Sequence, residues 1–235
     1  VINAFLSAED KNFYEHEGVD FTGLLRAVRD NIINYGHGKS LVGGSTITQQ
    51  VVKNFLLTNE KSLERKIKEA ILATRISHVY SKDKILELYL NEIYLGLGSY
   101  GVAAAAQNYF NKPLDDITIE EAALLAAEPK GPSLYDPRKY YAAAKERRDW
   151  VIDRMFDAGY ITADELTTAK ETPITLRKRD AAEIARAEFF AEEVRRSLKD
   201  MYGDSVLYEG GLVVKTTLNP TLQKMSDDAL RKALI

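Results

Sequence analysis

Apolar residues recur every three or four positions along most of this 235-residue chain, which is the spacing of an amphipathic α-helix. Capping residues and glycines at the ends of these runs strengthen the pattern. The predicted helices lie in residues 1–14, 22–35, 46–55, 58–74, 81–96, 102–110, 118–127, 139–157, 162–170, 182–201 and 221–234. Only residues 210–220, GGLVVKTTLNP, alternate as a β-strand does. The chain is therefore predicted to be mainly α, with a small α/β segment at its C-terminus.

The most informative stretch of the pattern is Gly43–Glu69, GGSTITQQVVKNFLLTNEKSLERKIKE. Two glycines end a polar turn, and Thr46 with Gln49 three residues later forms a capping box that starts a helix. One face of this helix is predicted to meet the core and another to meet something polar. The apolar stripe is Ile47, Val51 and Phe55, and the polar face is Gln49, Gln50, Lys53 and Asn54.

A second helix in this stretch, predicted to be capped by Thr58, separates apolar from charged side chains more strongly. Its predicted apolar face is Leu63, Ile67, Ala70, Ile71 and Thr74, and its predicted charged face is Lys61, Arg65, Lys68 and Glu69. The charged face has two interpretations. It is a solvated surface with an Arg65–Glu69 pair at i,i+4, or it is a site for a di-anion such as pyrophosphate, which needs cations and amide groups.

Composition narrows the choice of function. A chain of this length with 45% hydrophobic residues can bury a full core, so one domain plus an appendage is expected. Its formal net charge of −3 argues against a general nucleic-acid binder, which would carry a basic surface. Basic charge is local instead, because residues 61–84 hold seven cations and three carboxylates. This is the distribution expected of a site for an anion.

Several residue types are informative by their absence or their spacing. The chain has no cysteine, which excludes a disulfide framework and thiol catalysis, and its three histidines, at positions 16, 37 and 78, do not form a zinc motif. No run approaches the roughly 18 apolar residues of a membrane span, and no signal peptide is visible. Because Val1 lies inside a predicted helix, the chain is expected to be a fragment whose N-terminal anchor is missing.

Three further parts of the chain have a distinctive composition: residues 22–35, residues 128–137 and the C-terminal tail. Residues 22–35 form a basic amphipathic helix that can be a core element or lie at a membrane interface. Residues 128–137, EPKGPSLYDP, contain three prolines and a glycine, which predicts a rigid, non-helical loop. The composition changes near Pro173, and the tail beyond it has too little apolar content to make a complete domain.

Five motifs follow one another along the chain. They are EDxxFxxHxGxD from Glu9 to Asp20, then GGSTITQQVVKN, ERKIKE, KILELYLNEIYLG and PKGPSLYDP. In this order they resemble the motifs of the family 51 glycosyltransferases, the peptidoglycan polymerases of class A penicillin-binding proteins. The resemblance covers residues 1–175, and residues 176–235 resemble the start of a linker toward a transpeptidase domain whose own motifs are absent. It implies a lysozyme-like, two-lobed helical fold.

The resemblance also implies a reaction. Lipid II is polymerised into β-1,4 glycan strands with inversion: the GlcNAc 4-hydroxyl of one lipid II attacks the MurNAc of the growing glycan, and undecaprenyl pyrophosphate leaves. By matching position, Glu9 is the general base on that hydroxyl and Glu69 is a second carboxylate nearer the donor. The matching donor-phosphate cations are Lys53, Lys61, Arg65 and Lys68, and the other expected substrate contacts are Asp10, Ser45, Gln49, Gln50 and Lys130.

Elementary chemistry agrees with this assignment. A sugar hydroxyl is a poor nucleophile, so a carboxylate that takes its proton is useful, and burial can raise the pKa of that carboxylate toward the working range. Phe5, Leu6 and Phe13 are expected to provide such an environment for Glu9, whereas cations near Glu69 should hold it ionised. Pyrophosphate needs charge stabilisation more than protonation, so cations can replace a general acid. No metal site and no required cofactor are predicted, although Mg²⁺ or Mn²⁺ could bridge a pyrophosphate to a carboxylate.

The partners implied by the resemblance are lipid II, the growing glycan, a membrane surface, the inhibitor moenomycin and other cell-wall synthesis proteins, with no nucleic acid. The expected location is the bacterial cell membrane, with the active domain on its outer, periplasmic or extracellular face. Two departures from the family pattern are visible. Glu128 stands where an apolar residue is expected, and the loop between the first two motifs is longer than usual.

Two other functions compete with the polymerase. A muramidase of similar fold would use Glu9 and Glu69 as acid and base, but hydrolysis of a neutral glycosidic bond has little need for four nearby cations. A non-catalytic glycan-binding module explains the folding signals but leaves the Glu9–Asp10 pair and the cations without a purpose. Incubation with lipid II distinguishes the three by yielding long glycan, cleaved glycan or neither.

Overall fold

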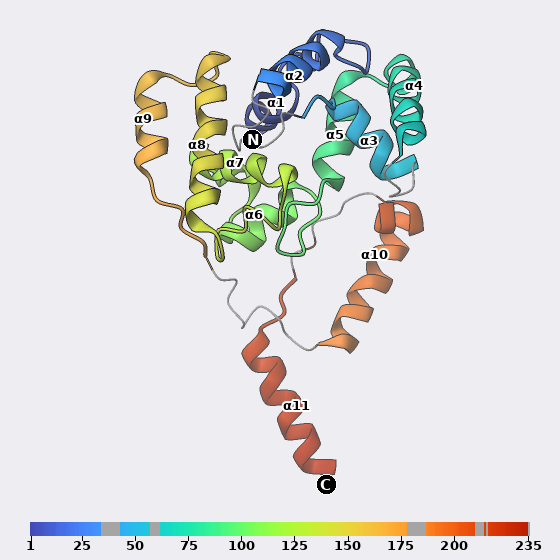
Figure 1. Ribbon diagram of the computed structural model, residues 1–235. Coiled ribbons are helices and arrows are strands. Elements are labelled where there is room, and N and C mark those ends of the chain that lie inside the picture. Colours follow the sequence, from blue (N-terminus) through green and yellow to red (C-terminus); the bar gives the residue numbers. More distant parts are fainter. Residues whose placement is uncertain (34–42, 57–61, 178–186, 210–213, 215, 235) are drawn as a thin grey trace. The chain divides into compact units, whose positions relative to one another are not determined.

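The computed structural model describes residues 1–33, 43–56, 62–177, 187–209, 214 and 216–234 (Figure 1). It contains two compact units, Val1–Lys178 and Arg179–Ile235. Regular structure in the described residues is helical, and the only β pairing there is an isolated antiparallel bridge between Tyr94 and Tyr100. The prediction of a mainly α fold is confirmed.

The first unit is built from α-helices and two short 3₁₀-helices. They are α1 (Ile2–Glu9), α2 (Phe21–Ile33), α3 (Ile47–Leu56), α4 (Leu63–Val79), α5 (Lys82–Glu92), α6 (Val102–Phe110), η1 (Leu114–Asp116), α7 (Ile119–Ala127), η2 (Glu128–Lys130), α8 (Tyr141–Asp157) and α9 (Ala163–Glu171). The helix η2 corrects the prediction that residues 128–137 would be wholly non-helical. Pro129 permits this one turn because a proline is tolerated where a helix begins.

Helix α7 holds the packing of the first unit together. Its residues Ala122–Ala127 are all buried, and it contacts α1, α6, α8 and α9 (Figure 1). The run of alanines suits this position because small side chains let neighbouring helices approach closely. Helix α3 packs against α4 and α5, and its Ile47 and Val51 join the same buried core. One continuous core therefore supports both α1 and α3.

Local capping signals set the starts of the helices that carry the predicted motifs. The Thr46 N–H donates to Gln49 Oε1 at 3.0 Å, and the Gln49 N–H donates to Thr46 Oγ1 at 3.1 Å. The predicted capping box of α3 is thus confirmed, and such a cap contributes about 1 kcal/mol. Helix α4 is capped by Ser62, whose Oγ accepts the Arg65 N–H at 3.1 Å. The predicted cap, Thr58, lies outside the described residues.

Helix α4 faces the core with a different side from the one predicted. Ile67 and Ile71, assigned to its apolar face, are 55% and 50% exposed, whereas Glu69 is only 2% exposed. The cause lies far away in the sequence: Gly18 packs directly on α4, and a Cβ at Gly18 would come within 2.4 Å of the Ala73 carbonyl oxygen. This close approach turns Ala73 and Glu69 inward. The apolar face predicted from periodicity is therefore wrong.

Helix α2 exposes most of its large apolar side chains. Phe21, Leu25, Ile32 and Ile33 are 62–72% exposed, while Ala27 is buried. A core helix would bury these residues, so the arrangement favours the interfacial alternative for this segment. The predicted basic loop at Gly36–Lys39 lies outside the described residues.

The second unit contains α10 (Glu188–Glu209) and α11 (Pro220–Leu234). Helix α10 is kinked at Gly203, whose φ of 79° is not helical. A strand was predicted over residues 210–220; of these, residues 214 and 216–219 are described outside helices and strands, and Pro220 already begins α11. The described part of this unit therefore does not show the predicted α/β character.

Candidate active site

Glu9 is the last residue of α1, at the end of a buried turn that includes Phe5 and Leu6. The side-chain amide of Gln50, on α3, donates to Glu9 Oε2 at 2.7 Å. Burial raises the pKa of Glu9, and this effect outweighs the Gln50 hydrogen bond and the nearby positive charge of Arg147, which lower it. A carboxylate in this state is a stronger proton acceptor than an exposed one. The structure agrees with the environment that Phe5 and Leu6 predicted for Glu9.

Asp10 connects the first motif to the second. It is 6% exposed and accepts the Ile47 N–H at 2.9 Å, so its negative charge lies at the N-terminus of α3. His16 Nε2 lies 3.0 Å from both carboxylate oxygens of Asp10, while the Gly18 N–H donates to His16 Nδ1 at 3.1 Å. Because Nδ1 accepts a bond, Nε2 carries the ring proton and donates it to Asp10. The structure thus gives Asp10 a positioning role, and its predicted substrate contact stays a prediction.

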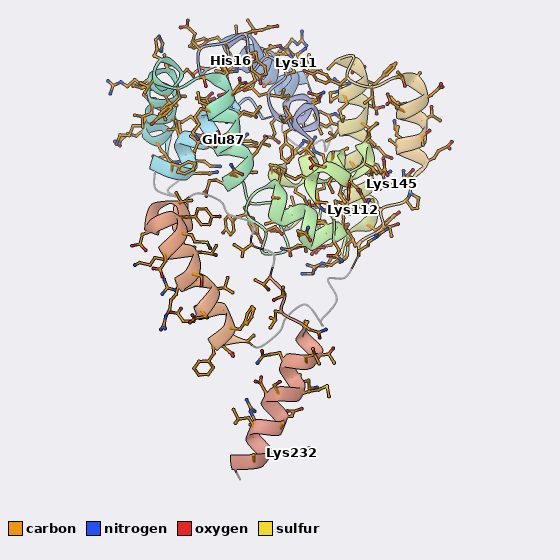
Figure 2. The ribbon with its side chains drawn as sticks, turned by 180° about the vertical axis from the view of Figure 1, so that it is seen from behind. Lys11, His16, Glu87, Lys112, Lys145 and Lys232 are labelled. Carbon is orange, nitrogen blue, oxygen red and sulfur yellow. The ribbon has the colours of Figure 1, made fainter. Side chains whose placement is uncertain are left out.

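The loop Gly43–Thr46 borders Glu9 from the other side. Thr46 Oγ1 donates to the Gly18 carbonyl at 2.6 Å, which fixes the loop against the turn that follows α1. Lys11 and His16, labelled in Figure 2, belong to this turn. A polar pocket of about 120 Å³ lies between α1, α2 and the loop, and its lining includes Glu9, Lys11, Arg26 and Ser45. Glu9 and Ser45, both predicted site residues, therefore share one pocket.

Glu69 lies on α4 in a strongly cationic environment. Arg65 Nη1 donates to Glu69 Oε1, and Lys66 Nζ donates to Glu69 Oε2 at 2.7 Å. Lys66 Nζ also donates to Ser45 Oγ at 2.7 Å, so the buried carboxylate is connected through Lys66 to the loop that borders Glu9. Lys66 is not among the site residues predicted from the sequence, although its i,i+3 spacing to Glu69 was a usable signal.

The other predicted cations and amides differ in exposure and in their partners. Lys68 does not meet Glu69: its side chain is 58% exposed and pairs with Glu64 at 2.6 Å, so the prediction that it shares a face with Glu69 is wrong. Gln49 is 4% exposed and caps α3, while Lys53 is half-buried one turn after the Gln49–Gln50 pair. Lys61 lies outside the described residues.

Two further cations face Glu9 from helices late in the chain. Lys130 ends η2, and burial lowers its pKa, with the neighbouring Arg147 adding to the effect. Arg147 is on α8, stacks over the Trp150 ring with its Cζ 3.9 Å from the centroid, and has a buried Nε without a hydrogen-bond partner among the described residues. The positive charges of both residues favour the ionised form of Glu9. Lys130 is among the site residues predicted from the sequence, whereas Arg147 is not, because no local pattern reveals its proximity to Glu9.

The arrangement provides one half-buried base with a raised pKa, two cations that act on it, Lys130 and Arg147, and two cations at Glu69, Arg65 and Lys66. Such a set can remove a proton from a hydroxyl and bind an anionic leaving group. Across the residues that the structure describes, no group of three or more His, Cys, Asp or Glu side chains is arranged to hold a metal ion. In the same residues, no helix is long and apolar enough to cross a membrane.

A family model described as transglycosylase matches residues 1–156. Penicillin-binding protein 1A of Rickettsia conorii is 54% identical over 235 residues, which is all of this chain and 30% of that protein. The protein of the same name from Aquifex aeolicus is 44% identical (100% of this chain, 31% of that protein), and penicillin-binding protein 1F of Bacillus subtilis is 42% identical (99% and 32%). The chain thus spans about a third of the length of these relatives.

Among solved structures, penicillin-binding protein 1A from Haemophilus influenzae is similar to this chain. It is 33% identical, with a TM-score of 0.40, and the match covers 69% of this chain and 21% of that one. The family match ends at residue 156, so the functional division predicted at residue 175 stays a prediction.

Proposed function

Because the chain belongs to the transglycosylase family, we propose that it is a peptidoglycan glycosyltransferase that polymerises lipid II into β-1,4 glycan strands. The reaction inverts the anomeric centre and releases undecaprenyl pyrophosphate. The observation that carries the proposal is the half-buried Glu9, oriented by Gln50 at 2.7 Å, with a raised pKa and next to a group of cations.

Glu9 acts as the general base. It accepts the proton of the GlcNAc 4-hydroxyl as that oxygen attacks the MurNAc carbon that bears the pyrophosphate. Its raised pKa brings it closer to the working pH, where a base is most effective. Gln50 fixes the orientation of the carboxylate by binding Oε2, which leaves Oε1 for the hydroxyl.

The pyrophosphate leaves toward the cations. Its developing negative charge needs several donors, and Arg65 and Lys66 are held in place by Glu69. Glu69 therefore orders cations and does not itself transfer a proton. Lys53 and Lys61 complete the donor side, with Ser45 contacting the same phosphates, and Lys130 lies nearer Glu9. A divalent metal is not required, so we expect turnover to persist when Mg²⁺ and Mn²⁺ are removed by a chelator.

The substrate's lipid keeps the reaction at a bilayer, on the outer face of the bacterial membrane. The exposed apolar residues of α2 supply a surface that dips into the interface, with Arg26 and Arg29 meeting anionic head groups. Moenomycin, a phosphoglycolipid, and other cell-wall synthesis proteins are further proposed partners.

The membrane contact is tested by flotation with liposomes. Leu25→Glu and Ile32→Glu are expected to reduce binding by about tenfold or more, because each places a charge where an apolar side chain enters the interface. Leu134→Glu, at a residue 66% exposed in the loop after η2, serves as a control and should bind as the unmodified chain does. Unchanged flotation of folded α2 variants would remove α2 from the membrane contact.

The activity itself is tested by incubation with lipid II and separation of the products by chain length. Long, lysozyme-sensitive glycan supports polymerisation. Short cleavage products from preformed glycan would instead indicate a muramidase, and binding without any product would indicate a glycan-binding module. Either of these two outcomes contradicts the proposal.

A further inference from the structure

Glu128 is a fully buried carboxyl group without a described hydrogen-bond partner. It joins the end of α7 to η2, is 0% exposed, and neither side-chain oxygen has a partner among the described residues. An ionised carboxylate in such a place is costly, since a buried charge needs a pair or several donors. This chain nevertheless carries an acid where an apolar residue was expected from the family pattern.

The oxygens around Glu128 explain how the acid is tolerated. Glu128 Oε2 and Tyr109 Oη both lie against Gly96: a Cβ on Gly96 would come within 3.2 Å of the first and 2.7 Å of the second. Tyr109 Oη donates its own proton to the Leu95 carbonyl at 2.6 Å. The phenol has therefore no proton left for Glu128 and can only accept one. A protonated Glu128 supplies that proton, and an ionised Glu128 does not.

The charged groups nearby also disfavour ionisation. Burial and then the negative charge of Asp136 raise the pKa of Glu128 to about 8, and they outweigh the neighbouring Tyr109 hydroxyl, which lowers it. Asp136 itself is engaged by Arg138, whose Nη2 donates to it at 2.8 Å, so Arg138 is directed away from Glu128. Lys139 is the other cation that acts on Asp136. Burial likewise raises the pKa of Tyr109, so this phenol stays neutral.

The turn that Glu128 anchors carries Lys130. The Gly131 N–H donates to the Glu128 carbonyl at 2.9 Å, and the Leu134 N–H donates to the Gly131 carbonyl at 2.8 Å. Lys130 ends this short helix, and its charge acts on Glu9. A shift of the Glu128 side chain out of its buried site must therefore move the segment that positions Lys130.

We propose that Glu128 is a positioning residue that works as a neutral acid: its carboxyl proton bonds Tyr109 Oη, and this bond holds η2 against the turn after α5 with Lys130 directed toward Glu9. Loss of the proton leaves a carboxylate without a donor, which is driven toward water and loosens η2. The role of Lys130 in turnover rests on the proposed glycosyltransferase function, but the protonation state of Glu128 does not.

The first test needs no activity. In the infrared spectrum of the intact chain near pH 7, a protonated-carboxyl band should be present and should be lost in Glu128→Gln. Glu92→Gln, at an exposed carboxylate at the end of α5, is the matched control and should keep the band. If the band is the same in the unmodified chain and in Glu128→Gln, the proposal is overturned.

The second test measures stability against pH. The folded state keeps the Glu128 proton up to about pH 8, whereas the unfolded chain releases it near the ordinary value of 4.5. Between these values the unmodified chain should lose stability relative to Glu128→Gln, by up to about tenfold in the folding equilibrium constant per pH unit, and by no more above pH 8. A difference that does not change with pH contradicts the proposal. If Glu128→Gln does not fold, Glu128→Met, which is also neutral, gives the same comparison.

The third test connects the acid to turnover. The alkaline decline of lipid II polymerisation should move to higher pH in Glu128→Gln, with activity near pH 7 retained, while Glu92→Gln should follow the unmodified chain. An identical alkaline decline in Glu128→Gln would overturn the positioning role. Absence of polymerisation in every variant and at every pH, with the infrared and stability results as expected, would count against the proposed function and leave the neutral acid established.

Discussion

Glu69 is buried and Glu9 is half-buried, and the groups that surround the two carboxylates are opposite in kind. Glu9 accepts one hydrogen bond from a neutral amide, and burial raises its pKa. Glu69 is held by Arg65 and Lys66, and Lys66 binds Ser45 as well. The amide of Gln50 binds one carboxylate oxygen of Glu9, which leaves the other for a reacting hydroxyl, whereas both oxygens of Glu69 are bound by cations. The partners of an acid, more than its burial, thus decide between proton transfer and the ordering of cations.

The largest effect is expected from Glu9→Gln, which keeps the shape of the side chain and removes the base. Polymerisation should fall by about 10²–10⁴-fold or more, as is usual for loss of a general base. Moenomycin affinity should stay within a few fold, because the donor-side cations are untouched. Lipid II turnover and moenomycin binding are measured on protein shown by circular dichroism to be folded. An active, folded Glu9→Gln enzyme would remove Glu9 from the mechanism.

Glu69→Gln is expected to lower the stability of the protein, its turnover and its moenomycin affinity. Removing the charge leaves Arg65 and Lys66 without their buried partner, so the free energy of unfolding should fall by about 1–3 kcal/mol, reduced from the value for a fully buried pair because Lys66 is half-exposed. Turnover and moenomycin affinity should decrease together. Loss of turnover with unchanged moenomycin affinity would indicate that Glu69 also transfers a proton. Glu9 and Glu69 would then not differ in role.

Two cations of α4, Lys66 and Lys68, can be compared by their effects on moenomycin affinity, which are expected to be smaller than the effect of Glu9→Gln on turnover. Lys66→Met removes the connection between Glu69 and Ser45 and should weaken moenomycin binding by about 1.5–3 kcal/mol, the range for a hydrogen bond to a charged group. Lys68→Met is the matched control: Lys68 is exposed and pairs with the exposed Glu64 instead of with Glu69, so the loss of moenomycin affinity should be several times smaller. Equal losses in the two variants would show that α4 contributes only its overall positive charge.

The smallest expected change is a displacement in pH. Gln50→Leu removes the hydrogen bond that favours ionised Glu9, so the pKa of Glu9 should rise further. A base works only when ionised, and activity is lost as pH falls through its pKa. The acid limb of kcat/KM should therefore move to higher pH in Gln50→Leu, with activity on the plateau reduced by a few fold. An acid limb that does not move would mean that another group sets it.

Local signals predicted local structure well. The capping box of Thr46 and Gln49 depends on neighbours within a few positions and is found, and the raised pKa expected from the apolar residues near Glu9 in the sequence is found as well. The orientation of α4 was wrong because it depends on Gly18 and Ser45, which periodicity within α4 does not include. Arg147 was missed for the same reason, since only the packing of α1 against α8 brings it toward Glu9.

Glu128 shows a third case, in which the sequence identified an anomaly but not its meaning. The family pattern predicts an apolar residue at this position, and the chain has an acid. The surroundings of Glu128 depend on Leu95, Gly96 and Tyr109, which lie 19 or more positions earlier in the chain. The hydroxyl proton of Tyr109 is already donated to the Leu95 carbonyl. A departure from a pattern thus locates a site for closer study, while the reason for it requires coordinates.

The bond between Thr46 Oγ1 and the Gly18 carbonyl also closes a loop of 28 residues that contains α2. Its two ends are joined at the base, and Asp10 secures the same junction through the Ile47 N–H. Doubling the length of a flexible loop costs only about 0.6 kcal/mol in closure entropy. Outside α2, which lines the pocket at Glu9, the segment can therefore gain or lose residues during evolution, or accept an inserted tag, while the junction beside Glu9 keeps its geometry. A change in the length of this segment therefore need not change the position of Glu9.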